Sequence, residues 1–408
     1  MDNTINRRDF IKHTTTVTVG MGLGAGALLA ACGSGGAGDA AQADAAPAAG
    51  TDNSAPAAMA KRMLGALEVT ELGLGCMNIA WAYGPSTGKD ASIALVRKAY
   101  EEGIRFFDTA EIYGPFISEQ IVGEALEPYR NEVVIASKIG FDIDFETGEQ
   151  HGLTSRPEHI RLAVEQMLKR LRTDRIDLLY QHRVDPQVPI EEVAGAMAGL
   201  IKEEKIRHYG LSEAGAATIR RAHKEHPVTA VQNEYSFWTR DPEAEVIPAC
   251  EELGIGFVPW SPLGMGYLTG KVTPEYSFSA SDLRTSMHFP RFTAEAMVKN
   301  RPLVELLGQV GGRYEASPGQ VALAWLLARK PFIVPIPGTR LIPHMQENTA
   351  ALKVRLTADD MRELEDGFAR IGVFGDRAPA GLKEAHDIGT SLGTTSKGTH
   401  GKTPLPTR

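Results

Sequence analysis

Short apolar segments alternate with longer amphipathic segments through the middle of the chain, from residue 61 to about residue 375. Residues 133–140 (VVIASKIG) are typical of a buried strand, whereas residues 157–173 show the apolar period of a helix. Because parallel strands need a crossover between them, this regular alternation predicts a parallel sheet. Eight strand–helix pairs can be distinguished. We therefore predict an α/β fold, a (β/α)8 TIM barrel over residues 61–375 with an N-terminal β-hairpin that closes one end.

The composition and the local motifs argue against several other classes of protein. Of the 408 residues, 23% are charged and 43% are hydrophobic, and the formal net charge is −8, as in an ordinary globular protein. No Lys/Arg-rich run occurs, so no nucleic-acid partner is predicted. No Gly-x-Gly-x-x-Gly motif opens a helix after the first strand, which argues against a Rossmann domain. Cys76 and Cys250 lack metal-ligand spacing, so we expect buried thiols and no metal site.

Residues 1–32 have the features of an export signal. Arg7-Arg8, followed by DFIK, resembles the twin-arginine export motif, and residues 14–31 form a weakly apolar stretch. A spanning helix would need about 20 strongly apolar residues. The sequence LAAC, which ends at Cys32, resembles a bacterial lipobox, in which Cys32 becomes the acylated first residue. These signals predict twin-arginine export and a lipid-anchored protein of the periplasm or cell envelope, with this anchor as its only membrane contact. The alternative is a chance Arg pair before a membrane anchor.

Low-complexity segments flank the predicted barrel. Residues 33–60 consist mainly of Ala, Gly, Ser, Pro and Asp, and are predicted to be a disordered tether. Residues 376–408 end in a stretch rich in Gly, Ser, Thr and Pro, and are predicted to be a C-terminal tail, also disordered.

Polar side chains stand where three consecutive predicted strands end. Asp108 ends the second strand, Lys138 the third and His182 the fourth, while Tyr113 lies in the loop five residues after Asp108. Active sites of parallel barrels form at the carboxyl ends of the strands, and neighbouring strands are about 5 Å apart. The sequence therefore predicts that these four side chains converge.

A phenol, an ammonium, a carboxylate and an imidazole together can protonate a carbonyl oxygen. We expect Lys138 to stabilise the phenolate and lower the pKa of Tyr113 from about 10. Asp108 would hold Lys138 charged, His182 would orient the carbonyl, and Tyr113 would act as the general acid in reduction and the base in oxidation. Taken singly, each residue has a simpler explanation, such as a turn cap, core packing, a solvated lysine or a buried histidine.

The segments DTAEIYG, SKIG and YQHR, which contain these residues, resemble the aldo-keto reductase superfamily, and the resemblance spans residues 62–374. WTRDPE after NEYSF is similar to the subgroup related to perakine and pyridoxal reductases. The resemblance implies NADP(H), bound across the top of the barrel without a Rossmann domain.

The resemblance also implies cofactor contacts, position by position. Ser212, Glu213 and Gln232 match the groups that hold the carboxamide, and Trp260 matches the aromatic residue that stacks on the nicotinamide. The remaining matches are Ser261, Leu263, Gly264 and Gly266 for the pyrophosphate, Gly338, Thr339 and Arg340 for the 2′-phosphate, and Gln346 and Asn348 for the adenine side. The chain departs from the pattern at His344, where relatives usually have Arg. Glycine-rich loops are also common as plain turns.

Aromatic residues in two loops are expected to line the substrate pocket: Trp81 and Tyr83 after the first strand, and Phe237 and Trp238 after the sixth. Lid packing is the other explanation for such residues. The sequence thus favours an NADP(H)-dependent oxidoreductase that reduces small aldehydes or ketones, or oxidises the corresponding alcohols or sugars. The alternative is an exported sensory or interaction protein that binds the cofactor on the same scaffold.

Overall fold

The computed structural model describes residues 59–383 and residue 387. The predicted export signal (1–32), nearly all of the predicted tether (33–60) and most of the predicted tail (376–408) lie outside these residues. None of the helices in the described part is long and apolar enough to cross a membrane.

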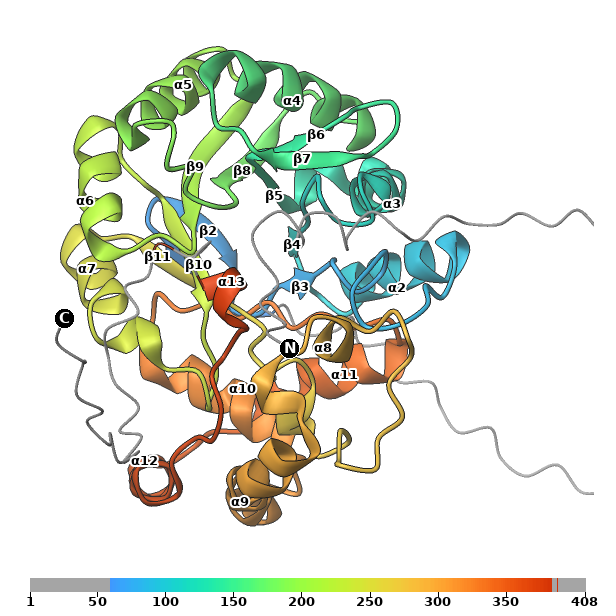
Figure 1. Cartoon of the computed structure of the whole chain (residues 1–408), viewed down its shortest axis with the longest axis vertical. Coiled ribbons are helices and arrows are strands. Elements are labelled where there is room, and N and C mark those ends of the chain that lie inside the picture. Colours follow the sequence, from blue (N-terminus) through green and yellow to red (C-terminus); the bar gives the residue numbers. More distant parts are fainter. Residues whose placement is uncertain (1–58, 384–386, 388–408) are drawn as a thin grey trace, which may run out of the picture.

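A seven-stranded parallel sheet forms the centre of the molecule. Its order is β11-β10-β9-β8-β5-β4-β3, so each strand pairs with the next parallel strand along the chain. The strands are β3 (Leu74–Gly75), β4 (Phe106–Asp108), β5 (Val134–Ile139), β8 (Ile176–Gln181), β9 (Ile206–Ser212), β10 (Ala230–Glu234) and β11 (Gly256–Trp260). Figure 1 shows these strands surrounded by a ring of helices.

The segment 332–338 closes the barrel between its first and last strands. The N–H of Phe257 in β11 donates to Phe332, and on the other side the N–H of Gly73 donates to Pro335. Isolated parallel bridges join Phe257 to Ile333 and Gly75 to Gly338. The eighth predicted strand is therefore present as a bridging segment, because Pro335 and Pro337 have no N–H with which to extend a regular ladder.

The predicted N-terminal hairpin covers one end of the barrel. Its strands β1 (Lys61–Leu64) and β2 (Leu67–Thr70) pair antiparallel. Leu64 and Val69 are buried in one cluster with residues from inside the barrel. A Cβ placed on Gly256 would lie 2.4 Å from the Cα of Leu64, so the hairpin rests directly on the start of β11.

Helices cover the outside of the sheet, and the main apolar cluster lies between the two layers. The helices are α2 (Lys89–Glu101), α3 (Ile117–Leu126), α4 (Pro157–Arg170), α5 (Ile190–Lys202), α6 (Ala216–Glu225), α7 (Val246–Leu253), α8 (Leu283–Ser286), α9 (Ala294–Gly311), α10 (Pro318–Arg329), α11 (Ile342–Ala350), α12 (Ala358–Ile371) and α13 (Ala380–Lys383).

Two features were not anticipated from the sequence. A second hairpin, formed by β6 (Phe141–Ile143) and β7 (Gln150–Leu153), lies between β5 and α4. The packed chain also continues beyond the predicted barrel end at residue 375, since Arg377 is buried against the ends of β9 and β10. The segment that leads into α13, red in Figure 1, crosses this face of the barrel.

Candidate active site

The carboxyl ends of the strands bring the four predicted catalytic side chains together. Asp108 is the last residue of β4, Lys138 lies in β5, and His182 directly follows β8. Tyr113 reaches the same place from the turn after β4. All four residues are buried, and Lys138 is completely inaccessible. The parallel strands therefore hold the four groups on a rigid frame, as their positions in the sequence predict.

Lys138 is the centre of the hydrogen-bond network. Its ammonium pairs with the Oδ1 of Asp108 and donates to the carbonyl oxygen of Thr109 at 2.7 Å and to the hydroxyl of Tyr113 at 3.2 Å. The Nε2 of Gln232, from β10, donates to the other oxygen of Asp108 at 2.8 Å. All three donors of Lys138 are thus used, and one of them is directed at the phenol.

Burial and charge act in opposite directions on these groups. Burial raises the pKa of Tyr113, and the Lys138 ammonium opposes that rise without reversing it. The predicted fall in the pKa of Tyr113 is therefore wrong in its net direction, although Lys138 acts in the predicted sense. Burial alone would lower the pKa of Lys138, but Asp108 and Tyr113 outweigh it and raise that pKa. Lys138 consequently stays charged beside a phenol that stays protonated at neutral pH.

His182 faces the same phenol as a neutral imidazole. Burial, together with the charges of Arg183 and Lys138, holds the pKa of His182 well below its ordinary value. Its ring meets those of Tyr113 and Phe141 edge-on, with centroids 5.8 and 5.3 Å away. Its Nδ1 is buried and has no hydrogen-bond partner among the described residues. His182 also lines the cavity, so its neutral imidazole can form a hydrogen bond with a ligand there without carrying a charge.

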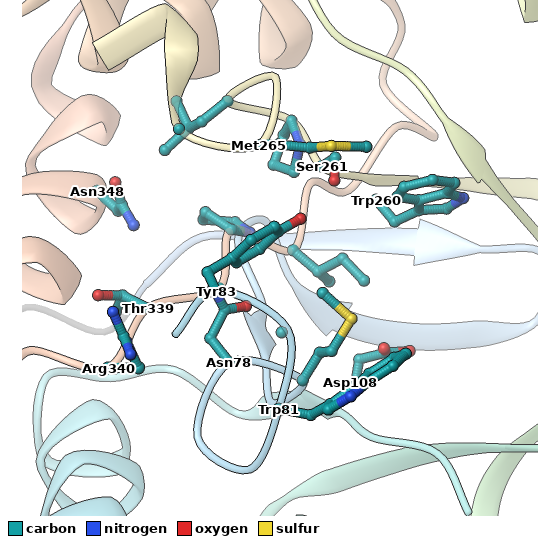
Figure 2. Close-up of a pocket in the computed structure, with 18 of the residues that line it drawn as sticks. Asn78, Trp81, Tyr83, Asp108, Trp260, Ser261, Met265, Thr339, Arg340 and Asn348 are labelled. Carbon is teal, nitrogen blue, oxygen red and sulfur yellow. The ribbon is translucent and has the colours of Figure 1, made fainter. Parts of the chain in front are cut away.

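A cavity of about 380 Å³ opens above these groups and extends away from them. Figure 2 shows Asp108, Trp81 and Trp260 towards one end of the view, and Thr339, Arg340 and Asn348 towards the other. Tyr83 lies between them. The cavity thus joins a catalytic end, lined by Tyr113 and His182, to a distant end that carries a guanidinium.

The loop after β11 has the shape expected of an anion-binding turn. Ser261 and Met265 adopt positive φ angles of 48° and 53°, and Gly264 and Gly266 adopt 57° and 91°. In the described part of the chain, the backbone N–H groups of Leu263 and Met265 have no backbone acceptor. Successive turns of this kind leave amide groups free for phosphate oxygens.

The residues present fit an extended dinucleotide, from the nicotinamide partners at one end of the cavity to a phosphate partner at the other. The predicted cofactor residues that line the cavity are Ser212, Gln232, Trp260, Ser261, Leu263, Gly266, Gly338, Thr339, Arg340 and Asn348. A Cβ on Gly338 would come within 2.5 Å of Asn78 Oδ1, so only glycine fits there.

Three predicted cofactor contacts point elsewhere. Glu213 is fully buried, and its Oε1 accepts the indole N–H of Trp260 at 2.8 Å while its Oε2 pairs with Arg377 at 2.5 Å. Gly264 packs on Trp238 instead of lining the cavity. Gln346 donates to Glu102 on the outer surface at 2.9 Å. Glu213 therefore fixes the ring that would stack on a nicotinamide, and does not itself face the cavity.

Two of the four aromatic residues predicted for the substrate pocket are core residues. Trp81 and Tyr83 line the cavity, as predicted. Phe237 packs edge-on against Trp325 at 5.5 Å, and Trp238 stacks on Tyr267 at 4.7 Å. Phe237 and Trp238 therefore do not line this cavity, contrary to the prediction, since helices α10 and α12 cover Phe237 and the loop after β11 covers Trp238.

Sequence reasoning missed three arginines at this site: Arg183 and Arg284 line the cavity, and Arg377 ties down Glu213. Only Arg183 carried a signal, since it directly follows His182 in YQHR. Arg284 pairs with Asp282 at 2.6 Å in the long loop before α9, and Arg377 comes from beyond the predicted domain end.

Known proteins share this arrangement. Residues 71–367 match the model of the Aldo/keto reductase family. A probable aldo-keto reductase 1 from Glycine max is 43% identical over 316 residues, which cover 77% of this chain and 90% of that protein. A glycerol dehydrogenase structure from Gluconobacter oxydans superposes with a TM-score of 0.69 at 27% identity, covering 76% of this chain and 95% of that one.

A holo aldo-keto reductase structure from Bacillus halodurans gives a TM-score of 0.62 at 26% identity, over 78% of this chain and 99% of that one. The matched residues include every strand of the barrel and all four residues at its catalytic end. On its sequence and its fold, this chain belongs to the aldo/keto reductase family, whose members are oxidoreductases of carbonyl compounds.

Proposed function

We propose that the protein is an NADP(H)-dependent oxidoreductase that interconverts small aldehydes or ketones and their alcohols, with Tyr113 as the proton donor and acceptor. One observation carries the proposal above all: a buried, charged Lys138 lies 3.2 Å from the Tyr113 hydroxyl at the floor of the cavity. The WTRDPE segment supports a place near the perakine and pyridoxal reductase subgroup.

The residues divide the chemistry between them. A bound nicotinamide supplies or accepts the hydride. In reduction, Tyr113 gives its proton to the carbonyl oxygen, and the nearby ammonium of Lys138 stabilises the phenolate that remains. Asp108 keeps Lys138 in place and charged, and neutral His182 orients the carbonyl oxygen by a hydrogen bond. In oxidation the same phenolate takes the proton from the alcohol.

The direct test measures the absorbance of NADPH after the purified protein is mixed with each of a panel of small aldehydes and ketones. We expect consumption of NADPH that depends on the carbonyl compound. If no member of the panel were turned over with either NADPH or NADH, the proposal would be overturned.

Arg340 supports the choice of NADP(H) over NAD(H). It lines the distant end of the cavity, where its Nη1 donates to the carbonyl oxygen of Pro85 at 2.5 Å, and no acidic partner is found for it in residues 59–383. His344 lines the same end, but burial and the nearby charge of Lys271 lower its pKa, so it is neutral at physiological pH. Lys271 is already paired with Glu347, so among the described residues Arg340 is the cation left at this end for the 2′-phosphate.

Arg340→Ala should therefore weaken NADPH binding far more than NADH binding, by roughly 10–100-fold, the value of a charge-assisted phosphate contact. His344→Ala is the matched control and should change the two affinities alike. Equal losses of NADPH and NADH in Arg340→Ala would place the 2′-phosphate elsewhere.

We further propose that the enzyme is exported by the twin-arginine route and anchored by a lipid on Cys32. The support is the order of the signals in the sequence, with Arg7-Arg8 before the soft apolar stretch and LAAC after it. Arg7-Arg8→Lys-Lys should hold the protein in the cytoplasm, and Cys32→Ser should free the exported protein from the membrane. Cell fractionation with a labelled acyl precursor reads out both steps. A Lys-Lys variant that is still fully exported would contradict this route.

A further inference from the structure

The catalytic end of the cavity contains a second cation, Arg183, in addition to Lys138. Arg183 directly follows His182 after β8, and it lines the cavity beside Tyr113 and Ser212. Its Nη1 donates to the carbonyl oxygen of His182 at 2.6 Å and lies 3.5 Å from the hydroxyl of Ser212. These contacts hold the guanidinium next to the catalytic imidazole and use only one of its three nitrogens.

The other cations around the cavity have assigned anionic partners. Lys138 pairs with Asp108, Arg284 with Asp282 and Lys271 with Glu347. Arg340, at the far end, is accounted for by the 2′-phosphate. Among the described residues, Arg183 has no carboxylate oxygen within 4.0 Å.

The acidic groups whose charges act on Arg183 already have other partners. Glu213 exerts the largest favourable charge effect on Arg183, but its oxygens bind the indole of Trp260 and the guanidinium of Arg377. Glu234 pairs with Arg377 as well. Arg183 therefore faces the cavity with spare donors and without a paired counter-charge.

Arg183 is half-buried and lines the cavity without an ion pair to any of the described residues, so an anion bound in the cavity would stabilise it. Burying a charge without a partner is strongly unfavourable, and a carboxylate fits the planar donors of arginine in a two-point contact. The cavity is also lined by apolar side chains, among them Met77, Trp81, Ile112 and Phe141. The site thus combines an apolar wall, a proton donor for a carbonyl oxygen and a cation close by.

We propose that Arg183 binds the carboxylate of the substrate, so that the preferred substrates are oxo acids: aldehydes or ketones whose carbon skeleton also carries a carboxylate a short distance from the carbonyl group. This inference rests on the proposed carbonyl oxidoreductase activity. In the reaction, the carbonyl carbon gains a hydride and its oxygen a proton from Tyr113, while the carboxylate stays unchanged on Arg183.

The test compares 2-, 3- and 4-carboxybenzaldehyde with the methyl ester of each, using NADPH and reporting kcat/KM for acid over ester. In Arg183→Gln this ratio should fall by roughly 10–100-fold for at least one of the three pairs, because the variant loses a charge-assisted contact that only the acid makes. Arg340→Gln is the matched control: it removes a guanidinium from the other end of the same cavity, and its ratio should stay within about threefold of the unaltered protein.

The possible outcomes separate this inference from the activity itself. In one outcome, both proteins turn over acid and ester, and the ratio of kcat/KM, acid over ester, is the same in Arg183→Gln as in the unaltered protein. That result would overturn the role of Arg183 but not the proposed activity. Turnover of neither compound by the unaltered protein would remove the activity and the inference together.

A second measurement covers the case in which Arg183→Gln does not fold. Benzoate should inhibit the unaltered enzyme at least roughly tenfold more strongly than benzamide, which has the same shape without the charge. Equal inhibition would contradict the proposal.

Discussion

The Tyr113 hydroxyl lies beside the charged ammonium of Lys138, which the fold keeps entirely out of solvent. A buried ion pair adds little to stability on average, but removing one partner of such a pair costs about 3–5 kcal/mol. Asp108 and Lys138 form a pair of this kind, and Gln232 from β10 holds the outer oxygen of Asp108. Side chains from three strands thus fix one ammonium beside one phenol, which is the arrangement needed for proton transfer and not for stability alone.

Tyr113→Phe should therefore remove activity without affecting the fold. We expect turnover to fall by roughly 10²–10⁴-fold, the usual contribution of a positioned general acid, while NADPH affinity changes little. Stopped-flow turnover and a cofactor titration measure the two effects. Tyr209→Phe is the control, since Tyr209 is a buried phenol of β9 that does not line the cavity. Turnover of Tyr113→Phe within about threefold of the unaltered enzyme would exclude the phenol as the acid.

Glu111, two residues before Tyr113, introduces a pH dependence of stability. It is fully buried, its Oε1 accepts the N–H groups of Gly140 and Phe141 at 3.0 and 3.1 Å, and its Oε2 has no partner among the described residues. Burial raises its pKa from 4.5 to about 8, and the charge of Glu119 adds to the rise. The folded protein thus keeps a proton that the unfolded chain releases.

The sign of the pH effect follows from that raised pKa. The stabilising contribution of Glu111 is complete below pH 4.5 and is lost as the pH rises to about 8. Glu111→Gln cannot ionise. As the pH rises from about 5 to about 8, its free energy of unfolding should therefore increase by roughly 3–5 kcal/mol relative to that of the unaltered protein. Urea unfolding at several pH values measures the difference. Parallel curves for the two proteins would show that Glu111 does not titrate in this range.

The sequence predicted that the four candidate catalytic groups lie together, because each stands at or near the end of a recognisable strand. It could not predict the direction of Glu213. This residue has a positive φ of 55°, which turns its carboxylate towards Trp260 and Arg377 even though its neighbour Ser212 lines the cavity. Phe237 and Trp238 were misplaced for a similar reason, because only the packed structure shows that α10 and α12 cover Phe237 and that the loop after β11 covers Trp238.

The N-terminal hairpin closes the barrel by contact at the backbone of β11. Gly256→Ala would place a Cβ 2.4 Å from the Cα of Leu64, where no side-chain rotation can relieve the overlap. We expect a loss of about 1–3 kcal/mol in the free energy of unfolding, as for other overpacked positions, and little change in kcat. Thermal melting and steady-state kinetics measure the two.

Gly195→Ala is the matched control for this substitution. Gly195 lies on the exposed side of α5, and a Cβ there meets no atom within 4 Å. The added methyl group should stabilise the helix by about 0.5–1 kcal/mol. If Gly256→Ala were as stable as Gly195→Ala, the hairpin would not be in rigid contact with the barrel.

The sequence predicted strands and helices well where the apolar pattern was strong, and least well where residues 332–338 close the barrel. The β1–β2 hairpin and the seven parallel strands were all recognisable. The eighth predicted strand is present but irregular, since its prolines break the ladder. The β6–β7 hairpin was missed, because its short strands carry little apolar pattern.

The far end of the described chain is attached to the barrel by charge as well as by apolar packing, since Ala378 belongs to the main apolar cluster and Leu382 packs against it. Arg377 lies between Glu213 and Glu234, both nearly inaccessible, with closest distances of 2.5 and 3.4 Å. Burial raises the pKa of Glu234 to about 6, and Arg377 opposes the rise. The same guanidinium thus fastens the C-terminal segment and, through Glu213, steadies the indole of Trp260.

Arg377→Met should therefore affect stability and cofactor binding together. Two buried carboxylates would lose their counter-charge, at a cost of about 3–5 kcal/mol near neutral pH. The loss should shrink as the pH falls towards about 6, because burial raises the pKa of Glu234 and the removal of Arg377 takes away the charge that opposes this rise, so Glu234 takes up a proton more readily in the folded variant. NADPH should also bind more weakly and quench tryptophan fluorescence less, since Trp260 is no longer held. The control is Arg220→Met, which breaks an exposed pair with Glu252 and should cost less than about 1 kcal/mol. If Arg377→Met melted like Arg220→Met at every pH, the buried ion pairs of Arg377 would contribute nothing to the stability of the barrel.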